Sequence, residues 1–321
     1  MIGVRKLAVF LGVLVWVFLS APAARAAFPE RPVRVVIPFA PGGGLDILTR
    51  LVGKSLAERW GQSVVIDNRS GANGLIGMEI VARSTANGYT LMAMASGRLD
   101  EHNLKYFAPV ALFATPPSLF VVHPGVKAQT VGDFIALARS QPGKMSYAST
   151  GSGAISHLAF ELFMSMANVE LTHIPYKGIG QAIPDLVGGR VETTIGPAQA
   201  MIPHVGSGRL RALAVTSAKR LATLPALPTV AESGLPGFET YGWFGMFAPR
   251  GVPPALVSAI NADINRALQS SEIKVRLAEA GAEPANLTAG AYRSFIEKDN
   301  ARWEKVIREK NIKVERPRLN L

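Results

Sequence analysis

The chain repeats one order of segments: a short run of β-branched and apolar residues, a turn rich in small residues, and then apolar residues at helical spacing. Its first instance passes from a strand-like run at 33–37 through the turn 39–44 to leucines at positions 45, 48, 51 and 56. Strands that alternate with helices in this way form mainly parallel sheets, because a parallel connection needs a crossover helix. The order therefore predicts an α/β protein.

The same pattern continues to the end of the chain and predicts two lobes. At roughly 150 residues per domain, 321 residues correspond to about two domains. We expect residues 27–122 and 240–321 to form lobe 1 and residues 123–239 to form lobe 2, each around a central sheet. Two extended crossings, near 119–122 and 240–247, would join the lobes and act as hinges for closing a cleft between them. Further strands are expected at 64–66, 89–94, 144–148, 171–174, 191–195 and 211–215, and helices at 75–82, 131–139, 154–166, 181–186, 254–268 and 291–307.

The first residues have the three parts of a secretory signal peptide. Arg5 and Lys6 precede an apolar run at 7–19, and Ala24-Arg25-Ala26 supplies a small-residue cleavage site. A membrane anchor is the alternative, but the run is shorter than the roughly 20 residues that a spanning helix needs. We expect residues 1–26 to be removed after Ala26 and the protein to be exported to the periplasm.

Composition excludes several classes of protein. A chain with 48% hydrophobic and 18% charged residues is not disordered as a whole. The absence of cysteine rules out thiol catalysis, disulfides and thiolate metal sites. The net charge of +11 is spread over the chain with acids between the bases, so no nucleic-acid partner is expected. Five histidines without ligand spacing and the lack of a P-loop lead us to expect no metal and no cofactor.

Three turns between a strand and a helix are suited to holding an anion, at 38–44, 148–153 and 175–180. In open α/β sheets a ligand binds at the carboxyl ends of the strands, beside helix starts whose first amides lack partners. A carboxylate or phosphate there gains hydrogen bonds and a favourable helix dipole. Glycine is common in such turns, so one turn alone is weak support. Turns from both lobes together favour a site in the cleft.

Several phrases occur in an order that is specific as a set. Among them are Ile-Pro-Phe-Ala-Pro-Gly-Gly-Gly-Leu-Asp at 37–46, Asp-Asn-Arg-Ser-Gly-Ala-Asn-Gly at 67–74 and Tyr-Ala-Ser-Thr-Gly-Ser-Gly at 147–153. Others lie at 28–33, 86–91, 173–178, 208–215, 227–234 and 243–249. Together they resemble the extracytoplasmic solute receptors of the tripartite tricarboxylate transporter family, also called Bug receptors.

The resemblance implies a fold and a site. It implies a type II periplasmic binding protein-like fold, α/β with mixed central sheets, that closes on a small carboxylated solute. The carboxylate is expected against backbone amides and hydroxyls of the turn 149–153, with the loops 39–46 and 175–178 closing over the rest. Receptors of this kind bind di- and tricarboxylates, acidic amino acids and aromatic acids. The residues that we expect to contact the solute are Phe39, Pro41, Gly43, Asp46, Ser96, Ser149, Thr150, Gly151, Ser152, His157, Tyr176 and Gly178.

Each of these side chains also has a structural interpretation. Asp46 lies in the first turn of its predicted helix, where its negative charge interacts favourably with the helix dipole whether or not it contacts the solute. Ser149 and Thr150 are also suitable as helix caps. His157 lies one turn into its predicted helix, a position more typical of a structural histidine than of one that contacts a ligand. Phe39 and Tyr176 would either sandwich the carbon skeleton of the solute or pack in the core.

Two segments depart from the family pattern. The stretch 95–106 is shorter than usual and lacks a common Tyr-Asp-Pro phrase, which would open one wall of the cleft or alter the distal pocket. Gly196-Pro197 stands where many receptors have a polar Asp-Asn pair, so no side-chain contact is expected from that loop.

The sequence thus predicts a monomeric receptor, not an enzyme. It would deliver a di- or tricarboxylate, an acidic amino acid or an aromatic acid to the membrane subunits of a tripartite tricarboxylate-type transporter. A sensor that presents its closed form to a membrane two-component kinase has the same fold and ligand chemistry and is the alternative. A periplasmic hydrolase is a remote one, because the chain has no G-x-S-x-G nucleophile turn.

Overall fold

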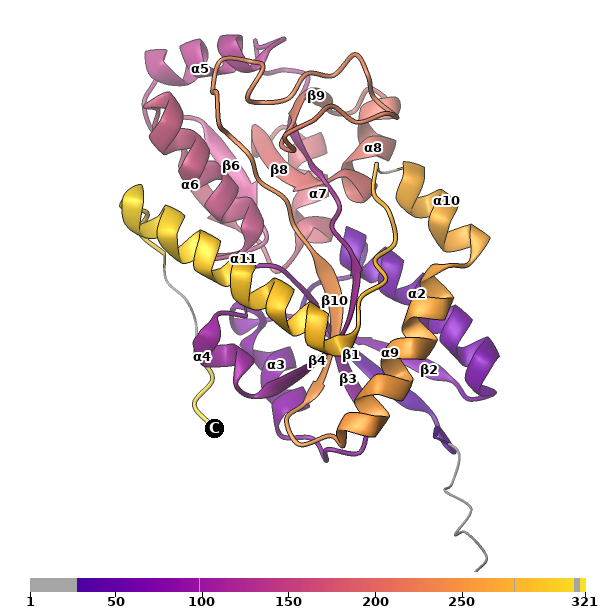
Figure 1. Cartoon of the computed structure of the whole chain (residues 1–321). Coiled ribbons are helices and arrows are strands. Elements are labelled where there is room, and N and C mark those ends of the chain that lie inside the picture. Colours follow the sequence, from indigo (N-terminus) through magenta and orange to yellow (C-terminus); the bar gives the residue numbers. More distant parts are fainter. Residues whose placement is uncertain (1–27, 98, 280, 315–317) are drawn as a thin grey trace, which may run out of the picture.

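The computed structural model describes residues 28–97, 99–279, 281–314 and 318–321, which form two lobes, each around a five-stranded sheet (Figure 1). The expected signal peptide lies outside these residues. Within them no helix combines the length and apolarity that a membrane crossing requires.

The first sheet has the strand order β2-β1-β3-β10-β4. β1 (Val33–Ile37) runs parallel to β2 (Val64–Asn68) and β3 (Thr90–Ala95). β10 (Phe244–Pro249) runs antiparallel to both β3 and β4 (Phe107–Ala114). The helical segments of this part of the chain are α2 (Gly44–Trp60), η1 (Ala72–Gly74), α3 (Leu75–Ala82), α4 (Glu101–Leu104), α9 (Pro254–Leu268), α10 (Ser271–Glu279) and α11 (Ala289–Glu309).

The second sheet has the order β7-β6-β8-β5-β9. β6 (Ser146–Ser149) runs parallel to β7 (Thr172–Pro175) and β8 (Thr193–Pro197). β5 (Ser118–Val122) runs antiparallel to both β8 and β9 (Arg211–Val215). Its helices are α5 (Val131–Ser140), α6 (Ile155–Ala167), α7 (Ile179–Val187) and α8 (Ala198–Gly206).

The two sheets share one plan, which confirms the predicted α/β fold with mixed sheets. In each sheet, the fourth strand in the spatial order is the strand that the chain enters directly after it crosses from the other lobe. This strand runs antiparallel to both of its neighbours. The loops after β1 and β3 therefore face those after β6 and β8. Ligands bind in such crevices at the carboxyl ends of parallel strands.

The predicted first crossing is wrong. Residues 119–122 lie inside β5, where every one of them pairs with β8, so they belong to the second sheet rather than to a hinge. An apolar, β-branched run does not distinguish a crossing from a fully buried strand. The chain passes between the sheets at 115–117 and again before β10, which begins at Phe244. We propose these segments as the lobe limits.

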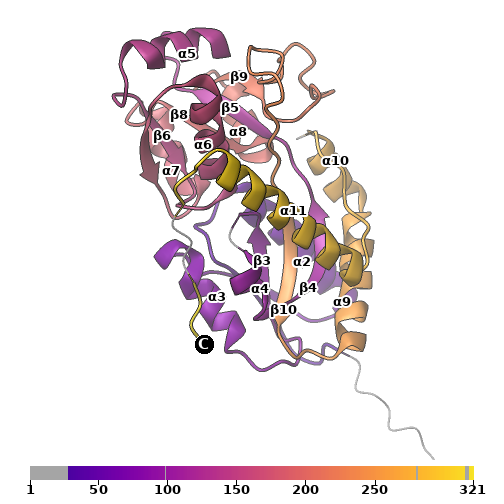
Figure 2. The same ribbon diagram turned by 60° about the vertical axis from the view of Figure 1, so that its left-hand side comes forward.

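The cores explain why the elements pack as they do. Phe120, Phe134, Phe160 and Phe163 interlock edge to face in the second lobe, with neighbouring ring centroids 5.1–5.6 Å apart around Phe120. Helix α11 begins on the first lobe, where Tyr292 and Ile296 are buried, and ends at the second, where Val306 packs against its core. Both views show α11 running diagonally across the molecule towards α6 (Figures 1 and 2).

Candidate functional site

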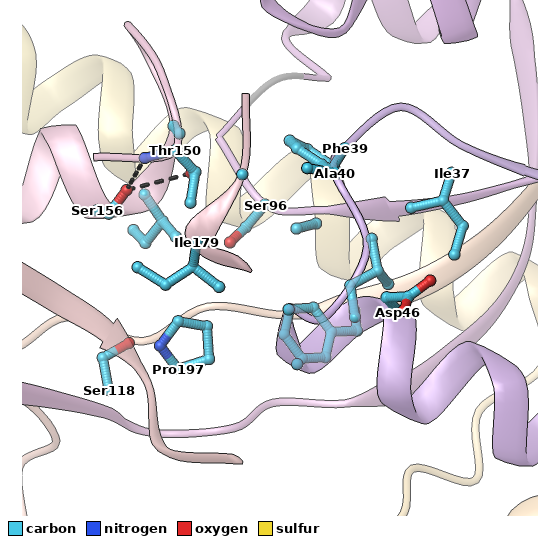
Figure 3. A pocket seen from close by; sticks show the side chains of 18 of the residues that line it. Ile37, Phe39, Ala40, Asp46, Ser96, Ser118, Thr150, Ser156, Ile179 and Pro197 are labelled. Carbon is cyan, nitrogen blue, oxygen red and sulfur yellow. Dashed lines mark hydrogen bonds between the residues drawn. The ribbon is translucent and has the colours of Figure 1, made fainter. Parts of the chain in front are cut away.

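A cavity lies between the lobes, where the loops after β1 and β3 meet those after β6 and β8. Its volume is about 60 Å³, on a measure in which one water needs roughly 10–15 Å³. Figure 3 shows Thr150 and Ser156 on one side of it and Asp46 on the other. The lining residues are Ile37, Phe39, Ala40, Gly43, Gly44, Leu45, Asp46, Ala95, Ser96, Ser118, Thr150, Ala154, Ile155, Ser156, Gly178, Ile179, Ile195, Pro197 and Phe244.

The lobes touch each other around this cavity. Ala40 in the loop after β1 donates its backbone N–H to the carbonyl of Lys177, at an N···O distance of 2.9 Å. The side-chain amide of Asn73 donates to the carbonyl of Ser152 at 2.8 Å. Both bonds join the first lobe to the second, so the structure has the cleft in a closed arrangement.

One further contact requires glycine. Gly97, which follows Ser96 in the turn after β3, has a left-handed φ of +94°. A Cβ atom there would stand 2.7 Å from both the carbonyl oxygen of Gly153 and the backbone nitrogen of Ile155. Only a residue without a side chain therefore allows this loop to close onto the start of α6.

Three helices start at the cavity without a side-chain cap. The residues before α2, α6 and α7 are Gly43, Ala154 and Gly178, and none of them has a side-chain oxygen to accept from the first turn. In contrast, Thr130 and Thr288 cap α5 and α11 away from the cavity. An uncapped helix start keeps its N–H groups and the positive end of its dipole available to an anion.

The start of α6 has backbone N–H groups that no acceptor in the described part of the chain uses. Among the described residues, no acceptor takes the backbone N–H of Ile155, Ser156 or His157. The hydroxyls of Thr150 and Ser156 lie beside these amides, with their oxygens 3.2 Å apart. Amides and hydroxyls that converge in this way suit a carboxylate better than a neutral group.

The backbone N–H groups of Thr150, Gly151 and Gly153 in the preceding turn, in contrast, already have acceptors. The backbone N–H of Thr150 donates to Ser156 Oγ, at an N···O distance of 3.0 Å. Gly151 N–H donates to Ser149 Oγ at 3.0 Å, and Gly153 N–H donates to His157 Nδ1 at 3.1 Å. The expectation, drawn from the resemblance, that amides of this turn hold the carboxylate stays a prediction. The bonds to Ser156 and His157 fasten the turn to the start of α6.

Two stacked imidazoles support the turn from behind. The rings of His157 and His173 lie 4.3 Å apart between centroids, with a 16° angle between their planes. His173 Nε2 lies 2.6 Å from Ser149 Oγ, the same oxygen that accepts from the turn. Burial and the neighbouring His157 lower the pKa of His173 from 6.5 to about 4, so this ring is neutral at neutral pH.

A carboxylate fixes the orientation of the second ring. His157 Nδ1 accepts a hydrogen bond, so its proton lies on Nε2, which faces Glu161 Oε1 at 3.4 Å. Tyr147 also donates to Glu161, at 3.0 Å. Burial alone would raise the pKa of Glu161, but these hydrogen bonds outweigh it and hold the pKa below its usual range.

Asp46 is buried, with its oxygens already paired. It accepts from Gly42 N–H at 3.0 Å, from Asn68 Nδ2 at 3.0 Å and from Arg50 Nε at 3.1 Å. Burial alone would raise the pKa of Asp46, but these donors outweigh it and lower the pKa below 3.8. The residue thus stays an anion that stabilises the start of α2.

The structure brings half of the predicted contact residues to the cavity. Phe39, Gly43, Asp46, Ser96, Thr150 and Gly178 line it. Pro41, Ser149, Gly151, Ser152, His157 and Tyr176 are not among its lining residues. Tyr176 instead donates its hydroxyl to Asp185 at 2.7 Å and packs against the core of the second lobe, whereas Phe39 packs against that of the first.

Other lining residues escaped the sequence argument. Ile155, Ser156 and Ile179 stand just after the small-residue turns, where a search of the first helical turn would have found them. Ser118, Ile195 and Phe244 lie on strands and show no signal other than their apolar neighbours. Pro197 contributes its ring to the wall, so the loop that lacks the Asp-Asn pair supplies carbon rather than a polar group.

Comparisons with known proteins found a family, related sequences and solved structures that this chain resembles. The sequence profile of the "Tripartite tricarboxylate transporter family receptor" matches residues 48–312. Protein BugT of Bordetella pertussis is 36% identical over 307 residues, which cover 92% of this chain and 94% of BugT. R. palustris Rpa4515 with adipate has a TM-score of 0.85 at 38% identity, covering 90% of this chain and 100% of that one. MatC (Rpa3494) from Rhodopseudomonas palustris with bound malate has a TM-score of 0.82 at 30% identity, covering 87% and 100%.

Proposed function

Because the chain belongs to the tripartite tricarboxylate transporter receptor family, we propose that it captures a small carboxylated solute in the cavity between its lobes. The family consists of solute-binding receptors and not of enzymes, so the task of the site is recognition and release. Two solved neighbours hold adipate and malate, and these ligands support a carboxylate as the recognised group.

The observation that carries the proposal is the uncapped start of α6. Three consecutive backbone N–H groups there have no acceptor among the described residues, and two hydroxyls stand beside them. A carboxylate would accept several of these hydrogen bonds at once while it neutralises the positive end of the helix dipole. The cleft would close over it through the bonds from Ala40 to Lys177 and from Asn73 to Ser152.

We further propose the place and the partner of this receptor. After removal of the signal peptide behind Ala26, the protein would work as a monomer in the periplasm. It would pass its solute to the membrane subunits of a transporter of the same family. The two lobes that enclose the site would present a joint surface to those subunits only in the closed state.

Thermal unfolding of the periplasmic protein against small acids, each paired with its primary amide, tests the proposal. A ligand at about 100 times its Kd should stabilise the native state by roughly 2.7 kcal/mol, which raises Tm by several degrees. The amide should give no shift, because it lacks the charge that the helix start attracts. Equal shifts for acids and amides, or none for any acid, would overturn the proposal.

A further inference from the structure

Carbon forms most of the cavity wall beyond the start of α6. Ile37, Leu45, Ile179, Ile195, Pro197 and Phe244 contribute to it from both lobes. Figure 3 shows Ile179 projecting between the Thr150–Ser156 side and the Asp46 side. Resting on the proposed function, we propose that the solute carries its carboxylate on a hydrocarbon body that places no hydroxyl group against this wall.

The wall is closely packed and leaves little freedom to rearrange. A Cβ atom on Gly43 would stand 3.1 Å from Ile179 Cγ2. One on Gly44 would stand 3.3 Å from both the Phe244 ring and Pro197 Cβ. Backbone and side chains of opposite lobes thus already touch along this wall. A polar substituent on the solute would meet closely packed carbon atoms there rather than water.

The carbon wall itself has no polar side chain, and the polar side chains that line the cavity are Asp46, Ser96, Ser118, Thr150 and Ser156. The hydroxyls of Thr150 and Ser156 bond to each other beside the helix start and belong to the carboxylate end. Ser96 Oγ accepts from Trp243 N–H at 3.2 Å, a bond that does not use the hydroxyl proton, whereas the oxygens of Asp46 accept from donors of the protein. Ser118 stands at one side of the cavity, next to Pro197 (Figure 3).

The physical consequence concerns a hydroxyl on the middle of the solute. A hydroxyl that faces the isoleucine, phenylalanine and proline carbon of the wall would lose hydrogen bonds to water that these side chains do not replace. A methyl group of the same size would gain from the same burial. The cavity therefore discriminates between a hydroxy acid and its methyl analogue by chemistry rather than by shape.

Two pairs of acids of matched shape test the inference by calorimetric titration. Isovalerate and β-hydroxybutyrate differ only by methyl in place of hydroxyl, and methylsuccinate and malate form the same pair among dicarboxylates. We expect the methyl member of whichever pair binds to bind at least tenfold more tightly. Hydroxy acids that bind as tightly or more tightly would overturn the inference while the proposed function stands. Failure of all four acids, and of the wider acid panel, would overturn the proposed function itself.

A substitution in the wall tests whether the wall itself causes the preference for the methyl-bearing acid. Ile179→Thr replaces a methyl-bearing branch by a hydroxyl at the first position of α7 and should reduce the methyl preference at least threefold. Ile183→Thr makes the same change one turn later on the same helix, where the side chain is part-buried but does not line the cavity. It should leave the preference unchanged. An unaltered preference in Ile179→Thr, or an equal change in both variants, would refute the assignment of the wall.

Discussion

A methyl group at Gly180 should prevent the cleft from closing without harming the open protein. Gly180 is the second residue of α7, and a Cβ atom there would lie 2.1 Å from the carbonyl oxygen of Pro41 in the opposite lobe. Real Cβ atoms essentially never approach a heavy atom within 3.0 Å. Gly180→Ala therefore forces the lobes about 1 Å apart at this point.

The cost falls on the closed state alone. Separation by that amount breaks the bond from Ala40 to Lys177, worth about 1 kcal/mol, and overpacking adds about 1–3 kcal/mol. The sum of about 2–4 kcal/mol corresponds to a Kd raised roughly 30- to 700-fold. Gly180 has no left-handed φ, so alanine in this helix should stabilise the open lobe by up to about 1 kcal/mol.

Titration calorimetry on Gly180→Ala, with an acid that binds the unmodified protein, measures the effect. Gly206→Ala is the matched control, because it places the same methyl group on α8 of the same lobe with nothing within 4 Å. We expect weak binding and an undiminished ligand-free Tm for the first variant, and ordinary binding for the second. If Gly180→Ala binds normally, the complex does not bring Pro41 and Gly180 together. If its ligand-free Tm falls, the contact is not specific to closure.

Two further predictions concern the support of the helix start. The folded protein keeps His173 neutral down to about pH 4, whereas the unfolded imidazole binds a proton near pH 6.5. The free energy of unfolding should therefore fall by up to about 1.4 kcal/mol per unit as pH drops from 6.5 to 4. Denaturant titrations across this range should show a flatter profile for His173→Gln, and an equal slope in both proteins would contradict the assignment. Ser156→Ala removes the acceptor of the Thr150 N–H and should weaken carboxylate binding by about 1–3 kcal/mol, or roughly 5- to 150-fold. The control Ser140→Ala changes an exposed serine at the end of α5, and similar losses of affinity in both variants would exclude the proposed role of Ser156.

Much of the fold could be predicted from local sequence. The expected helices at 75–82 and 254–268 and the strand at 211–215 have the observed bounds, and a glycine or proline stands at or shortly before the start of each. Strand β4 at 107–114 and the helices α8 and α10 were not predicted. β4 is apolar throughout because it is buried between β10 and the helices, and it has no alternation that would reveal its type.

Only part of the candidate site could be predicted from the sequence. That small-residue turns of both lobes meet could be inferred from topology, and six predicted residues indeed line the cavity. The apolar wall could not be inferred, because Ile195 and Phe244 are ordinary buried strand residues until two sheets face each other. The first crossing was misplaced for a related reason. The pairing of β5 with β8 joins residues more than 70 positions apart, a distance over which periodicity gives no information.

The turn 149–153 has fewer open amides than its sequence suggests. A turn of serine, threonine and glycine before a helix offers several amides, and the sequence alone suggests that all of them are open to an anion. In the structure, side chains at positions 156 and 157 return to the turn and accept the N–H groups of Thr150 and Gly153. These acceptors hold the turn against the helix and leave the uncapped N–H groups of α6 open. In the proposed site, a carboxylate at this helix start would be fixed in direction as well as in place, and the remainder of the solute would then lie along the wall of Ile179 and Phe244.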